Sequence, residues 1–220
     1  MELNDFYNRM RLEVSEYAKT RSESAAFLFW FLENFFRLEK QDAEDAICDQ
    51  TNDKGIDGVY VDDEDEIIFL FQSKYSPQDH QSQGDNDLRN FIGAREWFKD
   101  ESSIQNLLSS TASNELKSLV IGSGVTEKTS YKTVSVFVTN KKFNRHAEEY
   151  ISNADSLEGY DVNLLFEKYT YFADDENIFP AVDMYITNNS RIEYKLPYGT
   201  QNKVYAISSK QLFKLVCIQY

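Results

Sequence analysis

The feature that most constrains the fold is a pair of apolar segments, Gly58–Val61 and Ile67–Phe71, separated by the acidic run Asp63–Glu66. A turn at the acidic run predicts a hairpin in which the numbers of opposite residues sum to 129, so that Val59 faces Leu70. The second segment is apolar at every position. Because a strand with two apolar faces must be covered on both sides, we expect it to be central in a sheet.

Polar residues flank this hairpin at one end. Asp57 precedes the first strand, and Gln72 and Lys74 follow the apolar part of the second. Strand residues two positions apart share a face, so Gln72 and Lys74 project together and Ser73 points away. The expected register places Asp57 opposite Gln72, with Lys74 one step further. A carboxylate, an amide carbonyl and an ammonium in this arrangement suit a hard divalent cation and a phosphate.

The roles in such a site follow from the residue types. Asp57 is the anionic metal ligand, while Gln72 offers a side-chain carbonyl and Ser73 a backbone carbonyl. Lys74 orients an attacking water or neutralises developing charge. The spacing alone also fits a structural interpretation, in which Asp57 serves the turn and Lys74 extends its amine into solvent. The spacing of these residues does not distinguish the metal site from the structural role.

A single carboxylate holds Mg²⁺ weakly, so a second acid is expected from elsewhere. The aromatic segment Ala25–Leu32 predicts a buried helix, which Ser22 or Ser24 can cap. Glu23 in its first turn is favoured because a helix end can reach over a sheet edge. Glu33 is the rival.

The charge balance limits how the chain could bind nucleic acid. Its 220 residues carry a net charge of −14, which argues against binding through overall positive charge. A small basic cluster at Lys141, Lys142 and Arg145 is the candidate for contacts with substrate phosphates. Such clusters also occur as solvated turns.

Composition and targeting signals indicate a cytoplasmic protein. Cys48 and Cys217 are isolated and match neither a zinc site nor a disulfide framework. The first twenty residues are charged throughout, unlike a signal peptide. The apolar run Ala25–Leu32 is shorter than the roughly 20 residues that span a bilayer. We therefore expect no membrane partner.

The order of predicted elements indicates an α/β fold with a mixed sheet. Helices are expected over residues 3–19, 22–38, 86–100, 103–108, near 115, over 146–152 and over 209–220, and strands over 46–50, 133–139, 160–166, 191–196 and 203–208 besides the hairpin. We expect residues 1–170 to form one domain. Residues 171–220 are expected to be a C-terminal extension, which is either the start of a larger domain or a surface for a partner.

The sequence of the hairpin resembles that of a known protein family. The segments Lys54–Gly58 and Phe71–Tyr75 resemble the PD-(D/E)XK nuclease superfamily in its Q-x-K form, as in Mrr-like restriction enzymes. More narrowly, the chain resembles the N-terminal region of abortive infection phage resistance (AIPR) proteins. The V-F-V-T-N segment Val136–Asn140 and the segment Val204–Leu215 extend this resemblance.

The resemblance implies a restriction-endonuclease-like fold, in which helices flank a mixed sheet. It also implies nucleic-acid cleavage that depends on Mg²⁺ or Mn²⁺, with Asp57, Gln72 and Lys74 in the catalytic positions and a helix glutamate such as Glu23 assisting. The implied setting is bacterial anti-phage defence, with DNA favoured over RNA and a homodimer or a C-terminal domain as further partners. The alternatives are a catalytically silent sensor or assembly module and a small-molecule enzyme.

Overall fold

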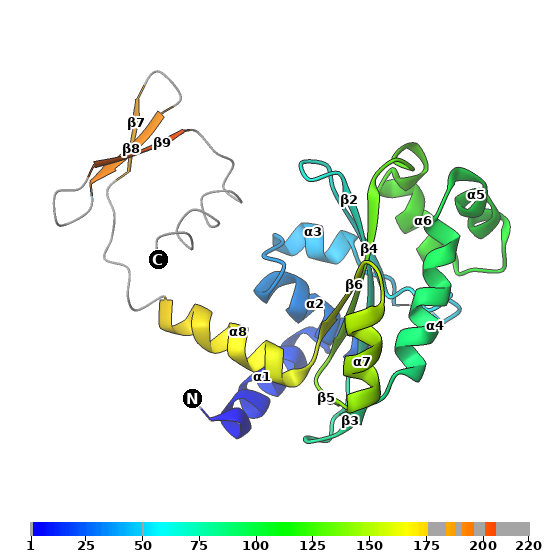
Figure 1. The fold of residues 1–220 in the computed structure, drawn as a ribbon, viewed down its shortest axis with the longest axis horizontal. Helices are drawn as coiled ribbons and strands as arrows, with labels where there is room; N and C mark the ends of the chain where they lie inside the picture. The colour runs from blue at the N-terminus through cyan, green and yellow to red at the C-terminus, as the bar shows by residue number, and fades with distance from the viewer. Residues whose placement is uncertain (1, 50, 176–183, 188–190, 196–200, 206–220) are drawn as a thin grey trace. The chain divides into compact units, whose positions relative to one another are not determined.

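The computed structural model describes residues 2–49, 51–175, 184–187, 191–195 and 201–205 (Figure 1). The chain forms two compact units, Met1–Thr170 and Tyr171–Tyr220. The helices are α1 (Leu3–Tyr17), α2 (Glu23–Asn34), α3 (Lys40–Asp45), α4 (Asn86–Arg95), α5 (Glu101–Ser109), α6 (Asn114–Gly122), α7 (Arg145–Asn153) and α8 (Val162–Asp175), with short 3₁₀ helices at Glu96–Phe98 and Val125–Glu127. The strands are β1 (Gly58–Asp62), β2 (Ile67–Lys74), β3 (Ser82–Gln83), β4 (Lys132–Thr139), β5 (Lys142–Phe143), β6 (Leu157–Tyr160), β7 (Met184–Thr187), β8 (Arg191–Lys195) and β9 (Gln201–Tyr205).

The main sheet of the first unit has the strand order β1-β2-β4-β6. Strand β1 is antiparallel to β2, whereas β4 is parallel to both β2 and β6. Val59 faces Leu70 and Val61 faces Ile68, so the predicted hairpin register is confirmed. The protein is therefore an α/β protein with a mixed sheet flanked by helices, as the sequence predicts.

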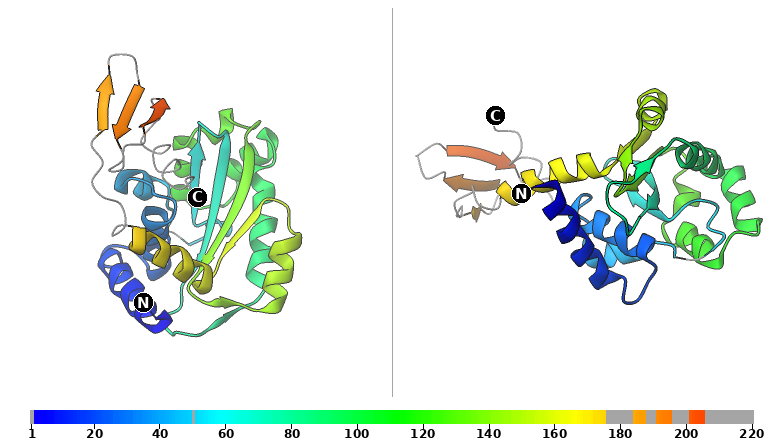
Figure 2. Two further views of the ribbon diagram at one scale, coloured as in Figure 1. Left: turned by 60° about the vertical axis from the view of Figure 1, so that its left-hand side comes forward. Right: turned by 90° about the horizontal axis from the view of Figure 1, so that it is seen from below.

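Two hydrophobic cores cover the two faces of this sheet (Figure 2). One core joins α1, α2 and the beginning of α8 to one face, and the other joins α4, α5 and α6 to the opposite face. Leu70 and Phe71 are adjacent in β2 and belong to opposite cores, and each is 0% exposed. The prediction that this strand is covered on both sides is confirmed.

Helix α2 is fixed at its N-terminus beside the sheet. The hydroxyl of Ser22 accepts the backbone N–H of Ala25 at 3.2 Å, which makes Ser22 the N-cap. The carboxylate of Asp49 in turn accepts the backbone N–H of Ser22 at 2.8 Å. Every residue from Ala25 to Leu32 is buried, as the aromatic sequence predicts.

The prediction of a strand over Tyr160–Phe166 is wrong. Strand β6 ends at Tyr160 and helix α8 begins two residues later. Asp161 causes the change, because its Oδ1 accepts the backbone N–H groups of Asn163 and Leu164, each at 3.0 Å, and so caps the helix. The buried apolar residues that follow recur at helical spacing: Val162, Leu165 and Tyr169. One continuous apolar run thus joins the end of a strand to the start of a helix.

The short strand expected over residues 46–50 is reduced to a single antiparallel bridge between Ile47 and Gly58, and the last residue of this range lies outside the described part. The bridge does not extend because the backbone N–H of Asp49 donates to the Glu115 carboxylate at 2.8 Å instead of to a strand. The outer edge of β1 is consequently paired only at its beginning.

The described part of residues 171–220 forms a separate antiparallel sheet in the order β7-β8-β9. Strands β8 and β9 overlap the two strands expected there, whereas β7 was not predicted. The helix expected over 209–220 lies outside the described residues. Among the helices that the structure describes, none is long and apolar enough to cross a membrane.

Gly58 provides a direct test of how β1 is held. A Cβ at this position would lie 2.7 Å from the backbone oxygen of Ala46. We expect Gly58→Ala to lower the free energy of unfolding by about 1–3 kcal/mol, because backbone has to move to relieve this contact. Urea denaturation measures the change.

Gly93→Ala is the matched control. Gly93 lies in α4, and a Cβ there would meet nothing within 4 Å. This substitution should raise stability by about 0.5–1 kcal/mol, as replacing glycine inside a helix does. If Gly58→Ala is as stable as the wild-type protein, the close contact with Ala46 does not constrain β1.

Candidate functional site

The candidate site lies where β1 begins and β2 ends, because the two strands are antiparallel. The carboxylate of Asp57 accepts the backbone N–H of Ser73 at 2.7 Å, and the Ser73 hydroxyl lies 3.4 Å from the same oxygen. The backbone N–H of Asp57 donates to the Phe71 carbonyl at 2.8 Å. Backbone and side chain together therefore fix Asp57 against the end of β2.

Gln72 is held by the turn that precedes Asp57. Its side chain is only 5% exposed, and its Nε2 donates to the Gly55 carbonyl at 2.9 Å. The other amide atom, Oε1, is buried and has no hydrogen-bond partner among the described residues. A buried amide oxygen without a partner is costly, and a bound cation would satisfy it.

The turn itself requires unusual backbone geometry. Gly55 has a φ of 82°, in the left-handed region that glycine adopts without strain. A Cβ on Gly55 would lie 3.4 Å from the Nε2 of Gln72. The carboxylate of Asp53 accepts the Gly55 N–H at 2.7 Å and closes the turn. The K-G-I-D segment thus positions both Gln72 and Asp57.

The pKa of the Asp57 carboxyl is raised to about 6, mainly because the group is buried. The hydrogen bond from the Ser73 backbone lowers this pKa, the charge of Asp53 raises it, and the charge of Lys74 lowers it. A carboxylate destabilised in this way gains from a cation, which replaces lost hydration with a positive charge.

Asp53 is a site residue that the sequence interpretation missed. It lies near enough to Asp57 to raise its pKa, so two carboxylates share this corner of the fold. The signal in the sequence is the N-D-K-G segment, in which an aspartate is typical of a turn.

Ser73 connects the site to α2. Its hydroxyl donates to the backbone oxygen of Ser24 at 3.0 Å, on the face of β2 opposite to Gln72. Since the N–H and C=O of one strand residue point to the same side, the Ser73 carbonyl faces the same side as its N–H, toward Asp57. The Ser73 carbonyl, the predicted backbone ligand, therefore lies on the same side of the strand as Asp57.

The contact with Ser24 also distinguishes the two candidate glutamates. Glu23 lies in the first turn of α2, next to Ser24. Burial raises the pKa of Tyr75, Arg11 lowers it, and the charge of Glu23 raises it, which places Glu23 near the end of β2.

Glu33 lies at the other end of the same helix, about 15 Å away at 1.5 Å per residue. It lies near Tyr17 of α1, whose pKa is raised to about 12 by burial and by the Glu33 carboxylate. The geometry thus favours Glu23 as the helix carboxylate.

The predicted phosphate contacts lie at the same end of the sheet. Lys74 faces Thr139 in β4, and Lys141 follows two residues later. The amine of Lys141 donates to the Gln83 side chain at 3.3 Å.

The other two members of the basic cluster are more exposed. Lys142 lies exposed in β5. Arg145 is exposed and pairs with Glu149 at 2.8 Å. Both amine and guanidinium groups are therefore accessible from solvent, and neither is held against Asp57.

The donor set is small for a metal site. Among the described residues, no group of three or more His, Cys, Asp or Glu side chains is placed to hold a metal ion. The residues present offer the carboxylate of Asp57, the unpaired oxygen of Gln72 and the Ser73 carbonyl. These are the oxygen ligands that Mg²⁺ and Mn²⁺ accept, with water completing the shell.

Comparison with known proteins adds no relatives. No protein-family model, curated protein or solved structure matches this chain.

The raised pKa of Asp57 predicts a pH-dependent effect of Asp57→Asn. Below about pH 3 the wild-type Asp57 carboxyl is protonated in both the folded and the unfolded state, and its burial does not lower the stability. Between about pH 4 and pH 6 the carboxyl ionises in the unfolded state but not yet in the folded state, and the wild-type protein loses stability over this range. In metal-free buffer, Asp57→Asn should therefore be more stable than wild type above pH 6, by up to about 3 kcal/mol.

Denaturation curves at pH 4.5 and pH 8, with EDTA present, measure this difference. Asp63→Asn is the control, because Asp63 is exposed and its pKa is lowered by Lys128. A variant Asp57→Asn that is less stable than wild type at pH 8 would show that burial does not raise this pKa.

Proposed function

We propose that residues 1–170 form a metal-dependent endonuclease domain that cleaves phosphodiester bonds of nucleic acid. The observation that carries the proposal is the buried, unpaired Oε1 of Gln72, which lies at the same end of the β1–β2 hairpin as the destabilised carboxylate of Asp57. Buried polar atoms are normally paired, so the unpaired Oε1 of Gln72 favours a ligand at this position over a purely structural role.

Asp57, Gln72 and the Ser73 carbonyl would hold Mg²⁺ or Mn²⁺. The cation would polarise the phosphate and lower the pKa of an attacking water. Lys74, whose charge reaches Asp57, stabilises the negative charge that develops on the phosphate oxygens. Asp53 and Glu23 supply the further negative charge that a single carboxylate lacks.

The substrate class follows from the charges around the site. Lys141, Lys142 and Arg145 follow β4 at the end of the sheet where Lys74 lies, so a phosphate backbone has cationic partners there. DNA is the favoured substrate. The proposed setting in anti-phage defence, the cytoplasmic location and a homodimer or C-terminal partner domain rest on the resemblance to AIPR proteins.

A catalytically silent module is the second candidate. It is favoured by the absence of a three-residue ligand group among the described side chains. It is also favoured by the hydrogen bonds from Ser73, which occupy one oxygen of Asp57. Such a module would use the same scaffold as a sensor or assembly domain.

Nuclease assays on the full chain separate these candidates. With Mg²⁺ or Mn²⁺ and plasmid DNA or single-stranded RNA, wild type should cut, and Asp57→Ala and Lys74→Ala should each lose about 100-fold or more in rate. Circular dichroism should show that both variants are folded.

Calorimetric titration with Mn²⁺ provides the binding measurement. Wild type should bind, and Asp57→Ala and Gln72→Ala should not, whereas Asp63→Asn should bind like wild type. Metal binding without any cleavage would support the silent module, and equal binding by Asp57→Ala would place the metal elsewhere.

The helix carboxylate has a separate test. Glu23→Gln should reduce the cleavage rate by about 10-fold or more, because it removes negative charge near the end of β2. Glu33→Gln removes the same charge from the same helix about 15 Å away and should leave the rate within 2-fold. A larger effect of Glu33→Gln would reverse the assignment.

A further inference from the structure

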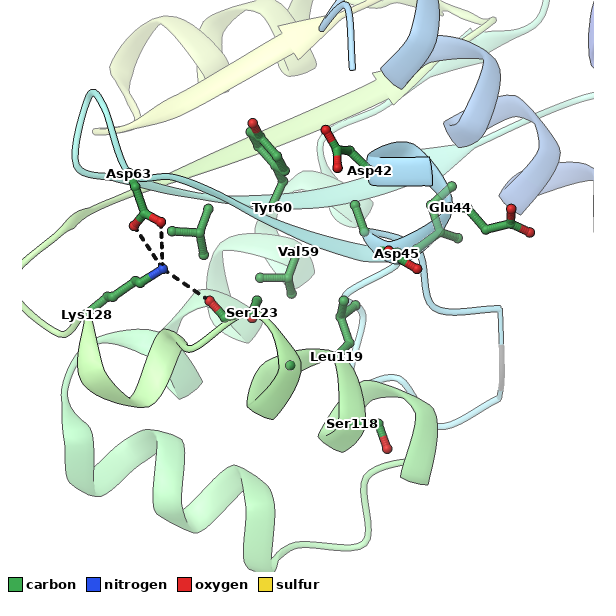
Figure 3. A pocket seen from close by; sticks show the side chains of 14 residues that line it. Asp42, Glu44, Asp45, Val59, Tyr60, Asp63, Ser118, Leu119, Ser123 and Lys128 are labelled. Carbon is green, nitrogen blue, oxygen red and sulfur yellow. Dashed lines mark hydrogen bonds and ion pairs between the residues drawn. The ribbon is translucent and has the colours of Figure 1, made fainter. Parts of the chain in front are cut away.

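A cavity of about 670 Å³ lies beside the outer edge of β1, between α3 and α6 (Figure 3). It is separate from the candidate nuclease site, and neither Asp57 nor Gln72 lines it. Val59 and Val61 of β1 and Leu119 of α6 are among the residues that line it.

The outer edge of β1 is paired at its beginning and open beyond Val59, along this cavity. The backbone N–H of Val59 donates to Ala46 at 2.8 Å, so this residue directs its backbone groups away from β2. Because successive strand residues alternate, Val61 directs its N–H and C=O outward in the same way. Apart from the β1–β2 ladder, no hydrogen bond of either group of Val61 occurs among the described residues. An open strand edge of this kind is a template for another strand.

The two sides of the cavity differ in chemistry. Val59 and Val61 belong to the core that contains Leu119, whereas Tyr60 packs on the opposite core with the residues of α3. Figure 3 shows Val59 directed toward Leu119 and Tyr60 directed to the other side of β1. A strand added here would therefore place alternate side chains against an apolar surface and against α3.

The α3 side is acidic. Four carboxylates line the cavity, Asp42, Glu44, Asp45 and Asp63, against the single amine of Lys128. Lys128 is already paired with Asp63 at 2.8 Å, and Glu44 is paired with Arg21 at 3.2 Å. Within the described residues, Asp42 and Asp45 form no ion pair.

We propose that the outer edge of β1 binds an extended peptide of a partner protein in which basic and apolar residues alternate. The peptide adds as a strand to Val61, with its apolar side chains toward Leu119 and its lysine or arginine side chains toward Asp42 and Asp45. Main-chain hydrogen bonds supply affinity, and the two walls of the cavity supply specificity.

Fluorescence anisotropy tests this with a labelled seven-residue peptide of alternating valine and lysine. Wild type should bind it, and should bind a matched valine–glutamate peptide at least 10-fold more weakly. A valine–lysine peptide that is N-methylated at its valines lacks the donors for the strand edge and should also bind at least 10-fold more weakly. Equal binding of either altered peptide, or no binding of the first, overturns the proposal.

Protein variants locate the site. Val61→Pro removes the outward N–H without removing a bond to β2, so peptide affinity should fall by at least 10-fold. Asp42→Asn with Asp45→Asn should weaken binding by about 3-fold or more. Glu148→Gln with Asp155→Asn makes the same change in net charge at exposed positions elsewhere and should change affinity by less than 2-fold.

Two further outcomes, an unfolded variant and self-association of the chain, also test the proposal. If Val61→Pro does not fold, the N-methylated peptide on wild-type protein gives the answer. If sedimentation shows that the chain associates with itself and that Val61→Pro abolishes this, a second copy occupies the edge and the peptide assignment is wrong. Loss of nuclease activity in the Asp57 variants does not affect these measurements.

Discussion

The hydrogen bond from the Ser73 backbone to the Asp57 carboxylate is the interaction on which the candidate site depends. It joins the first residue before β1 to the end of β2, where the ladder between the strands has ended. Ser73 also bonds to Ser24 and thereby fixes the N-terminus of α2 at the same corner. One strand residue thus aligns a carboxylate, a strand end and a helix that carries Glu23.

The site is held at a cost in stability. The pKa of Asp57 is raised to about 6, and the Oε1 of Gln72 is buried without a partner among the described residues. Both conditions disfavour the folded protein, and the cation that we propose would relieve both. The rigid turn at Gly55 prevents Gln72 from rotating its oxygen toward a protein donor, because its Nε2 is already engaged there.

The sequence predicts the hairpin well because strand alternation and a turn determine its register locally. Prediction from the sequence fails where packing between distant segments determines the local structure. The boundary between β6 and α8 depends on the cap at Asp161, and the single bridge at Ile47 depends on a bond between Asp49 and α6. Asp53 was missed because a turn aspartate gives no sign of its neighbours. The open edge of β1 was not predicted either, since the gap between α3 and α6 is a property of tertiary packing.

Paramagnetic broadening by Mn²⁺ tests the central claim, that a cation binds between Asp57 and Gln72. Nuclear magnetic resonance spectra of ¹⁵N-labelled protein, with Mn²⁺ added well below the protein concentration, report which amides lie near the ion. The account predicts that the side-chain amide of Gln72 and the backbone amides of Asp57 and Ser73 broaden first. Broadening that begins instead at the acidic turn 63–66 or at Asp42 and Asp45, with Gln72 unaffected, would contradict it.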